Sequence, residues 1–184
     1  MRKRKELDQY YTPEHLVTPL LDHVFPSIGG RILEPCCGDG SISRILEKLP
    51  RTAVLTNDID PRNPADYHGD ASALSFWEEA TETQGFDWVI TNPPFSHAFS
   101  ILKHSLAHCE NVAMLLRISF LEPTYERQDF LSEYPPDLVI FLPRFSFTRD
   151  GKSDMTTCAW MVWSKDLIDG GIRVAKKERP CRTK

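Results

Sequence analysis

A short apolar segment that stops at two consecutive prolines limits how this chain can fold. Residues 86–91 are mostly β-branched or aromatic, which is typical of a buried strand. Pro93 and Pro94 follow, and because proline has no backbone N–H to donate to a sheet, the strand must end there. An apolar stripe with helical spacing begins at Phe99. The pattern predicts a strand, a rigid turn and a helix, with the turn where open α/β sheets bind ligands.

The turn offers hydrogen-bond acceptors and a flat apolar ring. Asn92 carries a side-chain carbonyl, and Pro93 has a backbone carbonyl with no competing N–H. Two adjacent acceptors suit a planar –NH2 group, which has two N–H bonds to donate. Phe95 adds a surface on which a base could stack. Taken by itself, however, the four-residue turn could simply close a strand.

A second strand–turn–helix unit lies earlier in the chain. Residues 32–33 begin a strand, Gly38 and Gly40 permit a tight turn, and residues 41–49 have an amphipathic helical pattern. The turn lacks the third glycine of a dinucleotide-binding fingerprint. Glu34 precedes it, and an acidic residue there suits a ligand that carries an amino group better than a pyrophosphate.

Together, Glu34-Pro35-Cys36-Cys37-Gly38-Asp39-Gly40 and Asn92-Pro93-Pro94-Phe95 resemble motifs of the class I S-adenosylmethionine-dependent methyltransferases. Within them the chain is similar to the amino-methylating group typified by DNA adenine-N6 methyltransferases. Gln9-Tyr10-Tyr11-Thr12-Pro13 resembles the segment before the glycine motif in one subgroup, so the resemblance covers roughly residues 9–163. The Asn-Pro-Pro-aromatic motif is specific for methylation of a planar nitrogen, but cytosine-N4 and protein glutamine methyltransferases resemble it too.

The resemblance implies a fold, a cofactor and a reaction. The expected fold is an α/β, Rossmann-like methyltransferase domain over residues 9–172, with a mostly parallel seven-stranded sheet, helices on both faces and an antiparallel last strand. It would use S-adenosylmethionine, release S-adenosylhomocysteine and need no metal. The implied reaction methylates the exocyclic N6 amino group of adenine in DNA, in a flipped or unpaired base. RNA adenine and protein glutamine are alternative substrates, and a non-catalytic cofactor-binding subunit is a third class.

The cofactor residues implied by the resemblance follow the order of the expected elements. Asp58, after a strand over residues 52–56, could accept from both ribose hydroxyls, with Asp60 as the competing candidate. Asp70, after a weak strand over residues 66–71, would meet the adenine amino group, or could be a turn or capping residue. The expected cofactor-binding residues are Tyr11, Thr12, Pro13, Glu34, Pro35, Cys36, Gly38, Asp39, Gly40, Asp58, Ile59, Asp70, Ala71 and Asn92.

The catalytic and substrate-binding residues are expected in two loops. Asn92, Pro93, Pro94 and Phe95 form the expected catalytic turn. Residues 143–154 mix aromatic and basic side chains, which suits an unstacked base and its phosphates. The expected substrate-binding residues are Phe95, Arg144, Phe145 and Phe147, although the last two could also continue a strand.

The first cysteine of the glycine turn invites a different interpretation. Cytosine-C5 methyltransferases use a Pro-Cys nucleophile, and Pro35-Cys36 has that sequence. Here it lies in the turn where the cofactor is expected, so Cys36 is not expected to act as a nucleophile.

The remaining elements follow from apolar spacing. A helix is expected from Thr12-Pro13 to residue 24, with a kink at Pro19 or a restart at Thr18. The further helices are expected over residues 75–83, 98–108 and 126–133, and the further strands over 112–116, 138–142 and 157–163.

Charge is concentrated at the two ends. The 184 residues carry a net charge of −4, and residues 2–5 contribute +4 and residues 173–184 contribute +5, which leaves −13 for residues 6–172. The expected organisation is a basic arm over 1–8, one catalytic domain and a basic tail over 173–184, with DNA or RNA as the partner. The ends could contribute to nucleic-acid binding or be only solvated. No apolar run is long enough to span a membrane, so a cytoplasmic protein is expected.

Overall fold

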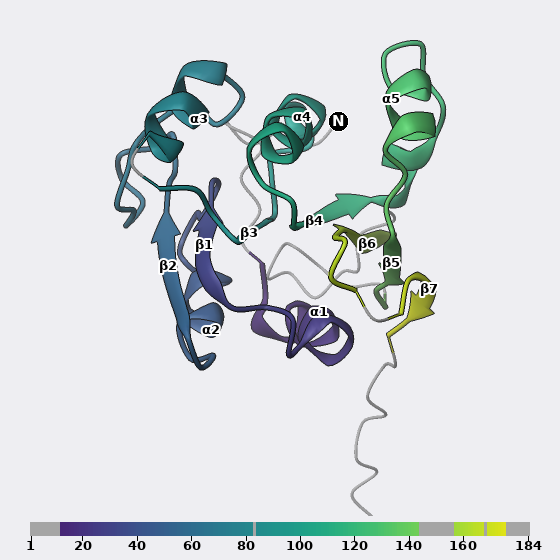
Figure 1. Cartoon of the computed structure of the whole chain (residues 1–184), viewed down its shortest axis with the longest axis horizontal. Helices are drawn as coiled ribbons and strands as arrows, with labels where there is room; N and C mark the ends of the chain where they lie inside the picture. Colours follow the sequence, from purple (N-terminus) through teal and green to yellow (C-terminus); the bar gives the residue numbers. More distant parts are fainter. Residues whose placement is uncertain (1–11, 83, 144–156, 168, 176–184) are drawn as a thin grey trace, which may run out of the picture.

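A seven-stranded sheet with the order β2-β1-β3-β4-β6-β5-β7 forms the centre of the computed structural model (Figure 1). The structure describes residues 12–82, 84–143, 157–167 and 169–175. The strands are β1 (Gly30–Glu34), β2 (Thr52–Thr56), β3 (Trp88–Thr91), β4 (Val112–Arg117), β5 (Leu138–Phe141), β6 (Cys158–Trp163) and β7 (Gly171–Val174).

The sheet is mostly parallel, as expected. β1 pairs in parallel with β2 and β3, and β3 with β4, whereas β6 runs antiparallel to both β4 and β5. The expected last strand, over residues 157–163, is β6, and it is antiparallel as predicted. It is not the last strand of the fold, because the short β7 follows it and pairs in parallel with β5.

The seventh strand is not where the sequence predicted it. Residues 66–71 form a single parallel bridge, between Asn57 and Tyr67, and no strand. The carboxylate of Asp66 accepts from the backbone N–H and the hydroxyl of Thr56, the last residue of β2. Side-chain hydrogen bonds therefore take the place of further backbone pairing between this segment and β2. The missed strand is β7, which ends at Val174 and so includes two residues of the segment expected to be a tail.

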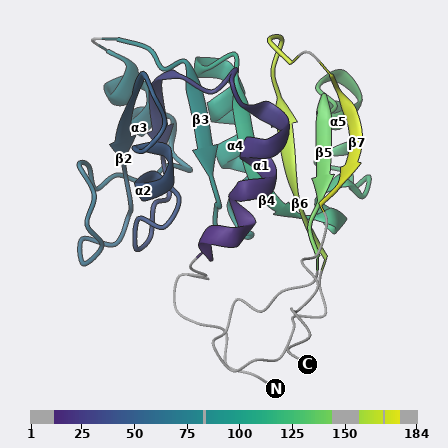
Figure 2. The same cartoon turned by 90° about the horizontal axis from the view of Figure 1, so that it is seen from below.

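Helices cover both faces of the sheet, as expected (Figures 1 and 2). α4 has its predicted bounds, and the N-terminal helix restarts at Thr18 after a separate 3-10 turn. α2 is shorter than predicted because residues after Leu46 continue in i→i+3 turns, such as the bond from Leu49 N–H to Leu46. The helices are η2 (Glu14–Leu16), α1 (Thr18–Val24), α2 (Ser43–Leu46), α3 (Leu74–Thr81), α4 (Ala98–His108), η3 (Ile118–Leu121) and α5 (Gln128–Glu133).

Two apolar layers hold the helices to the sheet. Neighbouring strand residues such as Ile32 and Leu33, or Trp160 and Met161, belong to opposite layers, because successive side chains of a strand point to opposite faces. α1 and α2 pack on the first layer, and α3, α4 and α5 on the second. None of the helices in the described ranges is long and apolar enough to cross a membrane.

Candidate active site

Three turns begin at one edge of the sheet. Glu34 and Thr56, at the ends of β1 and β2, are register partners, and β3 lies on the other side of β1. The chain leaves β1 toward α2 on one face of the sheet and leaves β3 toward α4 on the other face. Ligands of open α/β sheets bind where the strand order reverses in this way. The turns after β1, β2 and β3 therefore lie at the place that the sequence predicted for a site.

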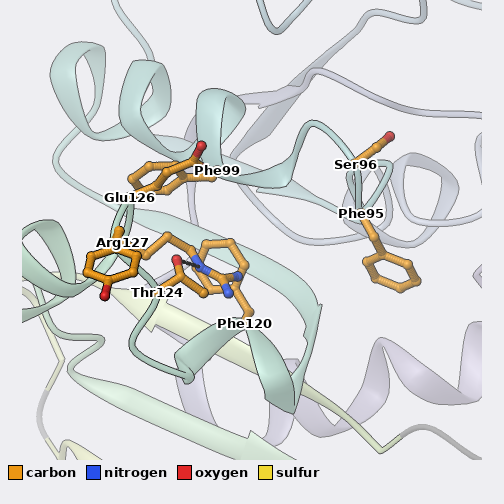
Figure 3. Close-up of a pocket in the computed structure, with 8 residues that line it drawn as sticks. Phe95, Ser96, Phe99, Phe120, Thr124, Glu126 and Arg127 are labelled. Carbon is orange, nitrogen blue, oxygen red and sulfur yellow. Dashed lines mark hydrogen bonds between the residues drawn. The ribbon is translucent and has the colours of Figure 1, made fainter.

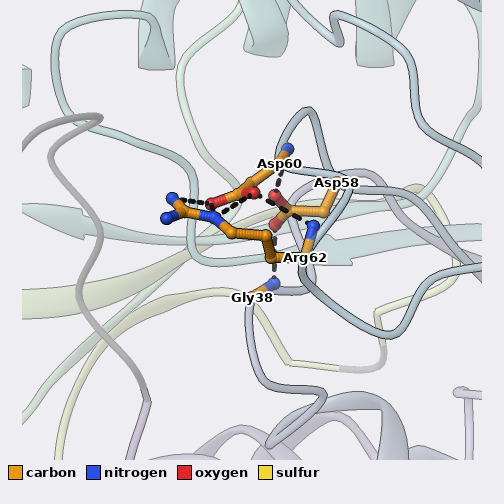
Figure 4. A network of polar contacts seen from close by, with 4 residues as sticks. All are labelled: Gly38, Asp58, Asp60 and Arg62. Carbon is orange, nitrogen blue, oxygen red and sulfur yellow. Dashed lines mark hydrogen bonds and ion pairs between the residues drawn. The ribbon is translucent and has the colours of Figure 1, made fainter.

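The glycine turn is tied to the end of β2 by one buried carboxylate. Asp58 accepts from the N–H of Gly38 through Oδ2 at 2.8 Å and from the N–H of Asp60 through Oδ1 at 2.9 Å (Figure 4). Gly38 and Gly40 have φ values of 56° and 77°, in the region that favours glycine. Asp39 closes the turn by accepting from the N–H and the hydroxyl of Ser41. These contacts set the shape of the turn before a ligand arrives.

The two candidate carboxylates after β2 have different partners. Asp60 forms an ion pair with Arg62, with 2.6 Å between Nη2 and Oδ2, and also accepts the Arg62 N–H (Figure 4). Asp58 instead faces the glycine turn. A carboxylate has about four lone-pair positions, so Asp58 can accept further bonds beside the two it makes. Ile59 is 53% exposed, as an apolar contact for a planar ring requires. Asp58 therefore stays the predicted ligand-facing carboxylate, and the Arg62 ion pair distinguishes Asp60 from it.

Asn57 is a positioning residue that the sequence did not single out. Its fully buried side chain donates to the carbonyls of Pro35 and Gly69, at 2.9 and 3.0 Å, and accepts from the N–H of Gly69. It therefore joins the glycine turn to the loop that carries Asp70. Asparagine directly after a strand is the only sequence signal for this role.

Asp70 forms a turn and does not cap the next helix. Its Oδ1 accepts from the N–H and hydroxyl of Ser72, and these bonds hold the pKa of the Asp70 carboxyl below its usual range. The N-cap of α3 is Ala73, so the capping alternative is wrong. The neighbouring Ala71 is buried, and its carbonyl accepts from the indole N–H of Trp77.

Glu34 is the strongest indication of a cationic ligand. The residue is 1% exposed, and its Oε2 has no hydrogen-bond partner within the described part of the chain. Burial raises the pKa of the Glu34 carboxyl well above its ordinary value. Hydrogen bonds from the N–H and hydroxyl of Ser43 offset part of this rise, and the nearby Asp39 and Asp58 add to it. A buried carboxylate is stable only when it is paired. The amino group of a bound amino-acid moiety would be such a partner, so the residues present fit S-adenosylmethionine.

The raised pKa of Glu34 predicts how the free energy of unfolding depends on pH. Between the ordinary and the raised pKa the folded protein holds a proton that the unfolded chain has lost, so stability falls as pH rises through this range. Glutamine does not titrate, so the Glu34→Gln variant does not lose this stability as the pH rises. Urea unfolding should therefore show the variant gaining stability relative to the wild type as the pH rises above the ordinary glutamate pKa of 4.5. The exposed Glu47→Gln serves as control, and the same gain there, or no gain in Glu34→Gln, would contradict the account.

The thiols of the glycine turn are neutral. Burial raises the pKa of the Cys36 thiol far above its ordinary value, and Asp58 and Glu34 raise it further. Burial likewise raises the pKa of Cys37 to about 12. A nucleophilic cysteine needs a lowered pKa, because the thiolate is the reactive form. The raised pKa values favour the expectation that Cys36 is not a nucleophile, which stays a prediction.

Cys36→Ser is accordingly expected to retain most of the methyl-transfer rate. The serine hydroxyl is slightly smaller than the cysteine thiol, and the expected reaction needs no covalent intermediate at this position. Turnover with labelled S-adenosylmethionine measures this. A complete loss of turnover in a variant that still binds the cofactor would show that the thiol takes part in the chemistry.

The turn after β3 contacts the N-terminal segment. The Asn92 amide donates through Nδ2 to the hydroxyl of Thr12 at 3.0 Å, and Thr12 is buried. Pro13 follows as the N-cap residue of η2. The structure thus brings together Thr12, expected at the cofactor, and Asn92, expected at the substrate. The Thr12 contact fixes the orientation of the amide.

Phe95 has a cationic neighbour that the sequence did not reveal. The guanidinium of Arg117, at the end of β4, lies over the ring, with 4.2 Å between Cζ and the ring centroid. Nothing in the sequence around Arg117 marks it, because the contact depends on the placement of β4 beside β3. The expected site residues Tyr11, Arg144, Phe145 and Phe147 lie outside the described residues.

No protein-family model and no curated protein matches the sequence. The backbone is, however, similar to that of several solved structures. It aligns with the type I restriction-modification system methyltransferase subunit from Streptococcus thermophilus with a TM-score of 0.62 and 16% identity, over 96% of this chain and 51% of that one. A putative class I S-adenosylmethionine-dependent methyltransferase from Listeria monocytogenes aligns with a TM-score of 0.62 and 12% identity, over 92% of this chain and 66% of that one.

A putative RNA methyltransferase from Pyrococcus horikoshii gives a TM-score of 0.63 and 19% identity, over 86% of this chain and 88% of that one. The chain thus spans about half the length of the Streptococcus subunit and most of the length of the Pyrococcus protein. At these identities the likeness concerns the backbone. The chain has the Rossmann-like fold of the S-adenosylmethionine-dependent methyltransferases.

Proposed function

We propose that this protein transfers a methyl group from S-adenosylmethionine to the exocyclic N6 amino group of adenine in DNA. The observation that carries the proposal is the pair of turns at the ends of β3 and β1. The Asn92 turn is held by Thr12, and the adjacent glycine turn follows Glu34, whose buried Oε2 has no partner among the described residues. One turn suits a planar amine, and the other suits a cofactor with an amino group.

The cofactor would lie against residues of the first two turns. Glu34 would pair with its amino group, Asp58 would accept from its ribose hydroxyls, and Ile59 would contact its adenine ring. Thr12 and Pro13 would lie beside its methionine end. When bound, S-adenosylmethionine supplies an electrophilic methyl group on a sulfonium, which is already a good leaving group.

The target amine would be held by the third turn. The side-chain carbonyl of Asn92 and the backbone carbonyl of Pro93 would accept its two N–H bonds and draw them from the plane of the ring. This frees the nitrogen lone pair for in-line attack, so the turn both aligns and activates the amine. Phe95 would stack on the base, which must be flipped or unpaired to reach it. No covalent intermediate is needed.

RNA adenine is the second candidate substrate. The Streptococcus relative is a restriction-modification subunit about twice as long as this chain, whereas the Pyrococcus protein of similar length is a putative RNA methyltransferase. The described part of this chain has one sheet with its covering helices. The likeness to the Pyrococcus protein favours RNA, whereas the motif pair favours DNA adenine.

Transfer of labelled methyl groups to DNA, to RNA and to a Gly-Gln peptide tests the proposal. Methyl-adenine recovered from DNA supports it, and methyl-adenine only from RNA supports the second candidate. Label found only in the peptide, or as methyl-cytosine, would contradict both.

The basic ends are expected to supply part of the affinity for nucleic acid. Residues 6–172 carry a charge of −13, which leaves few other sources of attraction for phosphates. Deleting residues 1–5 and 176–184 should flatten the slope of log affinity against log salt, by about 0.7–0.9 for each phosphate that the shortened protein no longer neutralises. An unchanged slope would mean that the ends do not contact the substrate.

A further inference from the structure

A groove of about 430 Å³ lies beside the Asn92 turn (Figure 3). Phe95, Ser96 and Phe99, from the turn and the start of α4, line one side. Phe120 of η3 and residues 124–127 line the other. Four of its eight lining residues are aromatic, so the groove presents rings to a ligand, immediately next to the turn proposed to hold the target amine.

A guanidinium is held in place within this groove. Arg127 lies over the ring of Phe120, with 5.1 Å between Cζ and the ring centroid, and its Nε donates to the hydroxyl of Thr124 at 3.2 Å (Figure 3). Because these two contacts fix the side chain, less conformational entropy is lost when the guanidinium binds an anion. Arg117 lies over Phe95 in the same way, so two of the aromatic rings that line the groove each have a guanidinium stacked on them. Glu126 adds a carboxylate, which repels phosphate but can accept from a base N–H.

An aromatic side chain at the rim of the groove is exposed to solvent. Tyr125 is 96% exposed, so burial in the apolar core does not account for it. Phe99 is partly buried, and packs edge-on against Phe130 with 5.3 Å between centroids. An exposed ring beside a fixed guanidinium is the combination with which proteins bind unpaired nucleotides, because every base can stack and every phosphate is an anion.

We propose that this groove binds the nucleotide adjacent to the target base in an unpaired strand. Tyr125 stacks on the base of that nucleotide, and Arg127 binds its phosphate. The inference rests on the proposed function, because the Asn92 turn places the target base. In a Gly-Gln peptide the residue adjacent to the target is glycine, which has neither a ring nor a phosphate, so the groove favours nucleic acid over this peptide as the substrate.

The test uses the full chain and fluorescently labelled single-stranded hexamers of DNA and of RNA. Tyr125→Ala and Arg127→Met should each weaken binding of the strand that the wild type prefers by about fivefold or more. Affinity for S-adenosylmethionine should stay unchanged. Tyr125→Phe keeps the ring and should retain affinity. Lys48→Met, in the exposed turn after α2, removes one positive charge away from the groove and should also retain affinity. Because Tyr125 is almost fully exposed, its replacement should leave folding intact.

Two contrary outcomes are distinguishable. If the wild type binds and methylates a strand while Tyr125→Ala and Arg127→Met bind it equally well, the groove is not a nucleotide site, and the proposed function stands. If the wild type binds the cofactor but neither hexamer, and methylates only the peptide, the proposed function fails and the groove assignment fails with it. Preference for the DNA or the RNA hexamer identifies the kind of strand.

Discussion

Replacing Asn92 by alanine is expected to lower the rate of methyl transfer about a hundredfold or more, because it removes one acceptor of a transition-state hydrogen bond. The affinity for S-adenosylmethionine should change little, since the side chain is proposed to face the target amine. Single-turnover rates with saturating labelled cofactor measure the first quantity, and calorimetry measures the second.

Gln84→Ala is the matched control for this variant. It removes an amide before the same strand, at the opposite end of β3, where Gln84 accepts from the guanidinium of Arg31. The control should keep the wild-type rate. A rate within a few-fold of wild type for Asn92→Ala would contradict the proposed role of the turn. An equal loss of cofactor affinity would instead place Asn92 at the cofactor.

Gly40→Val is expected to lower the affinity for S-adenosylmethionine more than tenfold. Gly40 has a φ of 77°, where a side chain costs about 1–2 kcal/mol. An added Cβ would also lie 3.1 Å from Nη1 of Arg44 and 3.2 Å from Oγ of Ser43. Both side chains donate to backbone carbonyls of the glycine turn, so moving them away from the added Cβ would weaken hydrogen bonds that hold the turn. About 1.4 kcal/mol of lost binding free energy corresponds to each tenfold in affinity.

Gly85→Val provides the same change without strain. A Cβ at Gly85 has no heavy atom within 4 Å, and the residue precedes β3 at the far edge of the sheet. Calorimetric titration of both variants, after urea unfolding has shown that each is folded, isolates the effect on the turn. Wild-type affinity in a folded Gly40→Val would mean that the cofactor binds elsewhere.

The sequence predicted the elements whose ends are set by local chemistry. α4 begins and ends as expected because the preceding prolines stop β3 and an apolar stripe continues to residue 106. The strands before Gly38 and Asn92 were predicted for the same reason. Since parallel strands end at one edge of a sheet, the sequence placed both turns at that edge, whereas the pairing of β1 with β3 is a finding of the structure.

Features that depend on distant parts of the chain could not be predicted. β7 pairs with β5 across more than thirty residues, and its first residue is glycine, which argues against a strand. The expected strand over residues 66–71 is lost to side-chain bonds with Asp66 and Asn57. Similarly, the position of Arg117 over Phe95 needs β3 and β4 to be adjacent, which no local pattern encodes.

The position of the transferred methyl group is the most direct test of the account. The protein would be incubated with S-adenosylmethionine bearing a trideuterated methyl group and a single-stranded DNA rich in adenine. The strand would then be digested to nucleosides for mass spectrometry beside N6-methyl and N1-methyl standards. The account predicts label on the exocyclic N6 nitrogen of deoxyadenosine, and its loss in Asn92→Ala. Label on a ring nitrogen, or none in any nucleoside from a protein that binds the cofactor, would contradict it.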